Sequence, residues 1–251
     1  MKTVLYVFSA TGNSLTTAWK LAEGLENCEV RSVVTADPQK VGEADAIGFV
    51  FPVYYGNMPY PVRAFVERMR MEGEPYLFAV VTCRGHVGAA AGRLDALLRE
   101  KGKHLSWAGM VKLPGNSFLN TPEEDQKSLE AQDSNIRALL NPIRNREEID
   151  LRSGELGETP VDYPGNFRGI MADESCRGCG SCAGVCPVGN ITIVDGKALV
   201  GNNCVTCLAC FHWCPTESIY MSKQDLIARR RKYHHPAVTY ADIVALNREA
   251  E

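Results

Sequence analysis

The sequence predicts an α/β protein: a doubly wound, five-stranded parallel sheet, followed by a second, small α+β domain. Three observations indicate this. Strand-like and helix-like segments alternate through the first half of the 251-residue chain, which is typical of a parallel sheet covered on both faces. A stretch rich in glycine and proline follows at 154–169. Eight of the ten cysteines then lie between Cys176 and Cys214.

The expected elements of the first half follow each other at short intervals. We expect strands at 2–8, 29–34, 46–51, 76–82 and 104–113, and helices at 14–25, 60–71 and 88–100. The apolar run at 46–51 is typical of a strand buried on both faces. A further helix is expected at about 122–140, ended or kinked by Asn141-Pro142. Ligands bind at the carboxyl ends of such strands, so the loops after the first, third and fourth strands form the candidate site.

Charge and hydropathy exclude several classes. The net charge is -3 and the sequence pI is about 6.0, which gives no general reason to bind nucleic acid or an anionic membrane. No apolar run approaches the roughly 20 residues that a membrane helix needs, and the apolar N-terminal stretch is shorter than a signal peptide requires. We therefore expect a cytoplasmic protein without nucleic-acid or membrane partners.

The clustered cysteines form two identical ladders. Each ladder reads Cys-x-x-Cys-x-x-Cys-x-x-x-Cys-Pro, and the second begins 28 residues after the first (204 − 176). Cytoplasmic thiols stay reduced, so this density indicates metal rather than disulfides. In this pattern the fourth cysteine ligates the other cluster. We therefore expect two [4Fe-4S] clusters, one on Cys176, Cys179, Cys182 and Cys214, and the other on Cys204, Cys207, Cys210 and Cys186.

The ladder region resembles dicluster bacterial ferredoxins over about 173–221. The resemblance implies low-potential, one-electron transfer between two cubanes. Small residues inside the loops leave room for a cluster and for amide-to-sulfur hydrogen bonds; these are Gly178, Gly180, Ser181 and Ala209. A pair of zinc sites is the alternative, although zinc usually takes its four ligands as separated pairs. A single degraded or three-iron cluster is a second alternative.

A short polar loop, 9–14, follows the first strand and leads into a helix. It lacks the lysine of a Walker loop and the glycines of a dinucleotide fingerprint, but a helix N-terminus favours an anion. The loop resembles the flavodoxin phosphate loop, which implies flavin mononucleotide (FMN). The matching residues are Ser9, Thr11, Gly12, Asn13 and Ser14. The alternative is an ordinary N-cap.

Two further loops are expected beside the flavin ring. The first supplies Pro52, Val53, Tyr54, Tyr55, Gly56 and Asn57, and the second supplies Thr82, Cys83, Arg84, Gly85, His86 and Gly88. A tyrosine of the first loop can stack on the ring, although one of the two can equally belong to the core. The second loop departs from the many flavodoxins that place an aromatic residue there. Its Arg84 and His86 are either stabilisers of an anionic flavin or solvated charges, and Cys83 and Cys28 are expected as small buried residues.

Taken together, 2–221 resembles the fused flavodoxin–ferredoxin family of anaerobic bacteria and archaea. The resemblance implies a flavodoxin-like sheet of order 2-1-3-4-5 and a 2[4Fe-4S] ferredoxin domain. The domain boundaries expected are 1–165 for the FMN domain (with an insertion and linker at 114–165), 170–222 for the ferredoxin domain, and 223–251 for a polar, helical tail.

Two functions follow from this organisation, and whether the chain is an enzyme stays open. The first is an electron relay between redox partner proteins that links one-electron and two-electron chemistry. The second is an FMN-dependent reductase of a small-molecule acceptor, without a recognisable nicotinamide fingerprint. A redox sensor docking through the basic run 229–232 is a third reading, against a plain solvated helix face. A homodimer is left open.

Overall fold

The computed structural model describes residues 1–116, 121–151, 165–223 and 231–248, and these residues form two units. The first unit contains 1–9, 13–114 and 121–151. The second contains 10–12, 115–116, 165–223 and 231–248. The second unit therefore includes three residues of the loop after the first strand, a grouping that chain order does not suggest.

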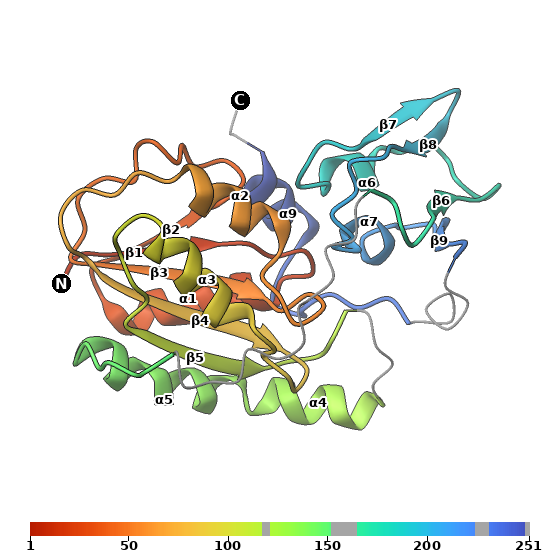
Figure 1. Ribbon diagram of the computed structural model, residues 1–251. Coiled ribbons are helices and arrows are strands. Elements are labelled where there is room, and N and C mark those ends of the chain that lie inside the picture. Colours follow the sequence, from red (N-terminus) through yellow and green to blue (C-terminus); the bar gives the residue numbers. More distant parts are fainter. Residues whose placement is uncertain (117–120, 152–164, 224–230, 249–251) are drawn as a thin grey trace. The chain divides into compact units, whose positions relative to one another are not determined.

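A five-stranded parallel sheet is the centre of the first unit (Figure 1). Its strands are β1 (Thr3–Val7), β2 (Cys28–Ser32), β3 (Ala46–Pro52), β4 (Tyr76–Cys83) and β5 (Trp107–Lys112). Their order is β2-β1-β3-β4-β5, with every neighbouring pair parallel. This is the order of the flavodoxin-like fold, so the predicted fold class and strand order are confirmed.

Helices cover this sheet on both faces. They are α1 (Asn13–Leu25), α2 (Tyr60–Arg68), α3 (Ala90–Arg99), α4 (Pro122–Glu130) and α5 (Gln132–Arg144). Helix α1 packs against α5, and α2 packs against α3. All of β4 and nearly all of β3 are buried, as expected for central strands that have a helical layer on each side.

The helix expected at 122–140 is two helices, and that prediction was wrong in its boundary. The chain breaks at Ala131, and Pro142 lies inside α5 rather than at its end. Proline at 142 removes the one N–H that would donate to the carbonyl four residues earlier, yet α5 continues through it to Arg144. A capping box begins α4: the Thr121 hydroxyl accepts from Glu124 N–H, and the Glu124 carboxylate accepts from Thr121 N–H.

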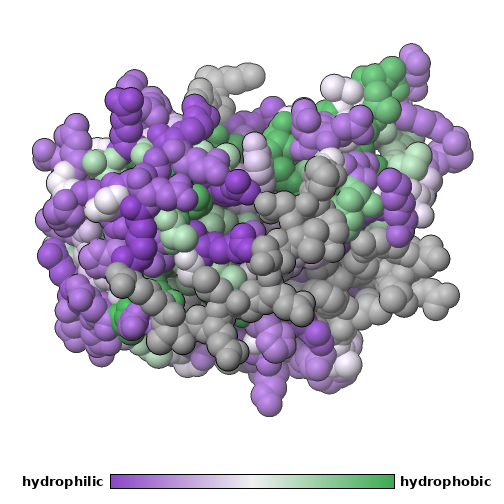
Figure 2. All heavy atoms as spheres, in the orientation of Figure 1, coloured by the Kyte–Doolittle hydropathy of each residue, from purple (hydrophilic) through white to green (hydrophobic). Residues whose placement is uncertain are grey.

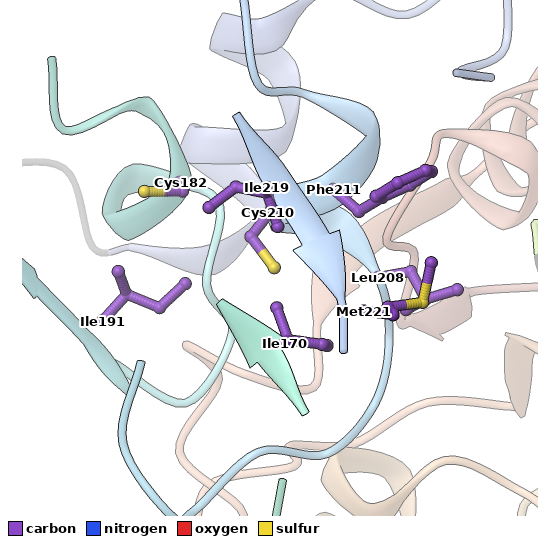
Figure 3. Close-up of a cluster of buried hydrophobic side chains, with 8 residues drawn as sticks. All are labelled: Ile170, Cys182, Ile191, Leu208, Cys210, Phe211, Ile219 and Met221. Atoms are coloured by element: carbon purple, nitrogen blue, oxygen red, sulfur yellow. The ribbon is translucent and has the colours of Figure 1, made fainter. Parts of the chain in front are cut away.

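The second unit is built from short elements around its own core. Strand β6 (Ile170–Ala172) pairs antiparallel with β9 (Ile219–Met221), and β7 (Ile191–Val194) pairs with β8 (Lys197–Val200). Two single-turn helices, α6 (Ser181–Gly184) and α7 (Ala209–His212), carry ladder cysteines. Figure 3 shows the core side chains, which are Ile170, Cys182, Ile191, Leu208, Cys210, Phe211, Ile219 and Met221.

The last described segment packs onto this second unit. Helix α9 (Tyr240–Asn247) buries Ile243 and Leu246, and the Asn247 side chain donates to the Val185 carbonyl at 3.0 Å. The segment before it, 224–230, lies outside the described residues and includes part of the basic run 229–232. Residues beyond the expected ladder domain thus contribute side chains to its packing.

Surface hydropathy is uneven over the second unit. The β7–β8 hairpin exposes Ile193, Val194 and Leu199, and Figure 2 shows hydrophobic spheres at this hairpin.

In the described ranges, no helix combines the length and apolarity that crossing a membrane requires.

Candidate functional site

Four ladder thiols line one pocket in the second unit. They are Cys186, Cys204, Cys207 and Cys210. The other walls are mostly apolar and include Ile170, Val188, Ile191, Val200 and Leu208. Cys186 comes from the first ladder and the other three come from the second. The pocket therefore gathers the set that crossed ligation predicts for one cluster.

The remaining four ladder cysteines are Cys176, Cys179, Cys182 and Cys214, and charges on these thiols affect one another's pKa values. Burial raises the pKa of the Cys182 thiol to about 11, and charge on Cys214, Cys176 and Cys179 raises this pKa further. Cys214, the last cysteine of the second ladder, therefore lies near Cys182 of the first ladder. Such effects decay with distance, so these thiols lie near one another, and charge on Cys182 in turn acts on Cys210 of the pocket.

The two thiol groups differ in exposure. Cys207 and Cys210 are each 7% exposed, and burial raises the pKa of both thiols. Cys179 is exposed, and hydrogen bonding to Ser181 lowers the pKa of its thiol. Without metal, the first group thus contains the more reactive thiol, Cys179, and the second group contains two thiols that are shielded from solvent, Cys207 and Cys210.

The ladder loops repeat their backbone conformation as well as their cysteines. Left-handed residues occur at Gly178 and Gly180 in the first copy, and at Thr206 and Leu208 in the second. These pairs share the same 28-residue offset (206 − 178 and 208 − 180). Each ladder therefore turns twice at equivalent positions, which lets three closely spaced cysteines face one side.

Backbone amides point at ladder sulfurs, as expected. Asn190 N–H donates to Cys186 Sγ at 3.3 Å. Ala198 N–H donates to Cys176 Sγ and Thr206 N–H to Cys204 Sγ, both at 3.4 Å. Such donors stabilise thiolate charge and raise the reduction potential of a bound cluster.

No single-ion site occurs among the described residues: no three His, Cys, Asp or Glu side chains there are arranged to hold a metal ion. One zinc ion needs all its sulfur ligands at about 2.3 Å from a single point. A four-iron cluster is larger and takes one sulfur at each of four corners. The thiol-lined pocket with its apolar walls and amide donors fits that larger group.

The polar loop after β1 leads directly into α1, as predicted. Gly12 adopts a φ of 96°, and α1 begins at Asn13 with no acidic residue in its first turn. The Ser14 hydroxyl lies 2.7 Å from the Thr82 hydroxyl, and the Asn13 amide donates to Pro114 O at 2.8 Å. These two side chains therefore tie the start of α1 to the ends of β4 and β5. Backbone N–H groups at the start of a helix can bind an anion there.

The loops after β3 and β4 lie against each other. Val53 N–H donates to Thr82 O at 2.9 Å, and Ala89 N–H donates to Gly56 O at 2.8 Å. A Cβ on Gly88 would be 2.4 Å from the Gly56 Cα. Only glycine allows this approach, so the two predicted ring loops form one surface at the carboxyl ends of β3 and β4.

Side chains of these ring loops differ in exposure. Tyr54 is half-buried and packs edge-on against Phe8, with ring centroids 6.3 Å apart. Tyr55 is exposed and has a φ of 52°. Arg84 and His86 are exposed, with Arg84 4.0 Å from Glu124. Tyr54 therefore contributes to the core, and Tyr55 is the tyrosine that is accessible to a ligand.

Cys83 is buried, as expected, whereas Cys28 is only partly buried, which differs from the expectation. Burial raises the pKa of the Cys83 thiol, and burial raises that of Cys28 to about 11. Both thiols are therefore protonated near neutral pH, and neither is an activated nucleophile.

The geometry fits an FMN phosphate at the loop after β1. Strand order reverses between β1 and β3, and the flavodoxin-like fold binds FMN at this switch point. The loop there offers a glycine turn, a helix N-terminus and no acidic side chain in the first helical turn. Pro52 is the last residue of β3, and Asn57 and Gly85 lie in the loops after β3 and β4.

Sequence reasoning missed several residues that hold these loops in place. Asn116 donates through its side chain to Cys207 O at 3.0 Å. Trp213 Nε1–H donates to Ala10 O at 2.9 Å, and His235 N–H donates to Thr11 O at 2.7 Å. Trp213 directly precedes a ladder cysteine, which is a visible signal, but its partner more than 200 positions away is not.

The buried His212 has a defined tautomer. Its Nδ1 accepts from Tyr233 N–H at 3.0 Å, so the proton of the neutral ring is on Nε2, which lies 2.8 Å from Asn116 O. His212 therefore connects α7 to residues at 116 and 233 within the second unit.

Comparison with known proteins finds structural likeness only. No protein-family model and no curated protein matches the chain. A flavodoxin from the domain Archaea is 18% identical, with a TM-score of 0.38, and the match covers 55% of this chain and 99% of that one. A Streptococcus pneumonia TIGR4 flavodoxin is 18% identical, with a TM-score of 0.38, and the match covers 55% of this chain and 98% of that one. An azoreductase from Bacillus anthracis is 13% identical, with a TM-score of 0.40, and the match covers 56% of this chain and 99% of that one.

Proposed function

We propose that this protein is an electron-transfer flavo-iron–sulfur protein that relays electrons between two [4Fe-4S] clusters and FMN. Clusters carry single electrons and a flavin carries one or two, so the pair would link one-electron with two-electron donors and acceptors. The observation that carries the proposal is the pocket lined by Cys186, Cys204, Cys207 and Cys210.

That pocket supports clusters because its membership is specific. An uncrossed arrangement would gather each ladder separately, yet the pocket takes its fourth thiol from the other ladder. Apolar walls limit water around the sulfurs, and amide donors balance negative charge there. These are the contributions that a protein makes to the potential and lifetime of such a cluster.

The flavin part of the proposal rests on the loop after β1 and on the topology. Backbone N–H groups at the start of α1 would hold the phosphate, and the surface formed by Tyr55, Gly56 and Gly88 would face the ring. Trp213 donates to Ala10 of the phosphate loop and directly precedes the proposed ligand Cys214.

Exposure suggests how partners reach the clusters. Cys179 of the first group is exposed, whereas Cys207 and Cys210 of the second group are buried. We propose that a redox partner protein exchanges electrons at the first cluster, with cytoplasmic location as the expected setting.

Cofactor analysis of the anaerobically purified full chain tests this function. The proposal requires iron, acid-labile sulfide and FMN in one preparation. A colourless chain that contains zinc in place of iron would contradict the cluster assignment, and a chain that contains iron but does not bind FMN would contradict the flavin assignment alone.

A reductase acting on a small molecule is the second candidate, and the exposed loop 84–87 favours it. An open loop at this edge would let an acceptor reach the ring. Reoxidation of the reduced protein separates the two functions: rapid reaction with small acceptors alone supports the reductase, and dependence on a protein acceptor supports the relay.

A further inference from the structure

Two consecutive carbonyl groups of the phosphate loop are held by donors from the other end of the chain. Ala10 O accepts from the Trp213 indole N–H at 2.9 Å, and Thr11 O accepts from His235 N–H at 2.7 Å. Trp213 is itself held in place, because its ring stacks on His234 with centroids 4.3 Å apart and planes 15° apart. Ala10, Thr11, Trp213 and His235 all belong to the second unit.

A third contact fixes the next residue of the loop. A Cβ on Gly12 would be 2.8 Å from the Val238 Cβ and 3.0 Å from the His235 Cβ. Val238 and His235 are each 3% exposed. The segment 235–238 therefore lies directly against Gly12 and leaves no space for a side chain there.

These contacts set the direction of the loop's N–H groups. In a planar trans peptide the C=O and the N–H point to opposite sides. With Ala10 O directed at Trp213 and Thr11 O directed at His235, the N–H groups of Thr11 and Gly12 are directed away from both. Successive N–H groups at such a turn, continued by a helix N-terminus, form an anion-binding concavity.

We infer that Trp213, His235 and Val238 are positioning residues for the FMN phosphate: they orient the 10–12 peptides so that N–H groups face the phosphate and carbonyl oxygens do not. A carbonyl turned toward the phosphate would repel it. The inference rests on the proposed function, since it concerns the phosphate of the proposed cofactor.

Trp213→Phe in the full chain tests this role, because phenylalanine retains an aromatic ring and removes the N–H donor. After removal of flavin with the clusters retained, flavin fluorescence quenching gives the Kd for FMN and for riboflavin, which lacks the phosphate. Loss of one hydrogen bond predicts a rise of roughly three- to tenfold in the Kd for FMN. The Kd for riboflavin and the iron content stay unchanged.

Trp107→Phe in β5 is the matched control, since Trp107 is another buried tryptophan, 7% exposed. It leaves the ratio of the two Kd values unchanged. Val238→Ala tests the same idea without changing the ladder region, and it decides the matter if Trp213→Phe loses iron. We expect Val238→Ala to raise the Kd for FMN and to leave the Kd for riboflavin unchanged.

Two results overturn the inference: equal weakening of FMN and riboflavin, or no weakening of either. Failure of wild-type protein to bind FMN would instead refute the flavin assignment of the proposed function. The wild-type measurement therefore separates failure of the proposed function from failure of the inference.

Discussion

Thr206 and Leu208 adopt left-handed backbone although neither is glycine, with φ values of 54° and 63°. A β-branched or bulky residue rarely adopts this conformation, and each instance costs on the order of 1–3 kcal/mol. The first ladder has Gly178 and Gly180 at the equivalent positions and avoids that cost. Only the second ladder therefore has non-glycine residues in the left-handed conformation at these turns, and the surrounding contacts must offset their strain.

Alanine substitution of the first-ladder glycines separates strain from steric clash. Gly178→Ala places a Cβ 2.5 Å from the Gly196 carbonyl oxygen, whereas the space around Gly180 is open to 4 Å. Both variants impose left-handed strain, but only Gly178→Ala forces two backbones apart. We expect Gly178→Ala to lose iron to a chelator several-fold faster than Gly180→Ala, as measured by visible absorbance. Equal rates would contradict the steric account.

Thiol reactivity in the apoprotein follows from burial and pKa. The pKa of the exposed Cys179 is lowered, so more of it is thiolate near neutral pH, while the pKa values of buried Cys182 and Cys210 are raised. We expect iodoacetamide to modify Cys179 first, as followed by peptide mass spectrometry, and the preference to vanish in urea. Earlier modification of Cys182 or Cys210 would show that the apoprotein does not keep this arrangement.

At the scale of elements, periodicity predicted the sheet well and the region after it poorly. The apolar runs at 46–51 and 76–82 became β3 and β4, because a short, continuous apolar run in an alternating chain is typical of a central strand. The break at Ala131 was not predicted, since no proline or glycine marks it. Pro142 was given too much weight, because α5 continues through it to Arg144 although one helical donor is lost.

Loop positions were predictable and loop contacts were not. The loops after β1, β3 and β4 share one edge because parallel strands end there, a consequence of topology. The approach of Gly88 to Gly56 depends on two backbones meeting across 32 positions (88 − 56). Nothing in either glycine alone indicates the other.

Gly88→Ala tests whether that approach supports the ring surface. The new Cβ meets the Gly56 backbone at 2.4 Å, and Gly88 already has a φ of 52°. We expect a loss of about 1–3 kcal/mol in unfolding free energy, measured by denaturant titration, together with weaker FMN binding. Gly85→Ala is the control, because its surroundings are open to 4 Å. Equal effects of the two substitutions would contradict the role of close packing.

At the scale of the whole molecule, the two sequence motifs were visible but their shared support was not. The ladders and the polar loop stand out by spacing and position. The contacts of the residues that hold them, such as Asn116 and Trp213, could not be predicted, because their partners lie 91 and 203 positions away. A single sequence gives no access to pairings at such separations.

Crossed ligation can be tested by comparing single serine variants. If Cys186 shares its cluster with Cys204, then Cys186→Ser and Cys204→Ser remove the same cluster. Their reduced proteins should give matching electron paramagnetic resonance spectra that differ from that of Cys176→Ser. A Cys186→Ser spectrum matching Cys176→Ser would show that each ladder binds its own cluster.

The central claim is that one chain contains two four-iron clusters and one FMN, and cofactor stoichiometry tests it most directly. Iron, acid-labile sulfide and flavin are measured on the same sample of anaerobically purified full-length protein. The account predicts about eight irons and about eight sulfides per chain, with one FMN released on denaturation. Zinc at two ions per chain with no sulfide and no flavin would contradict it.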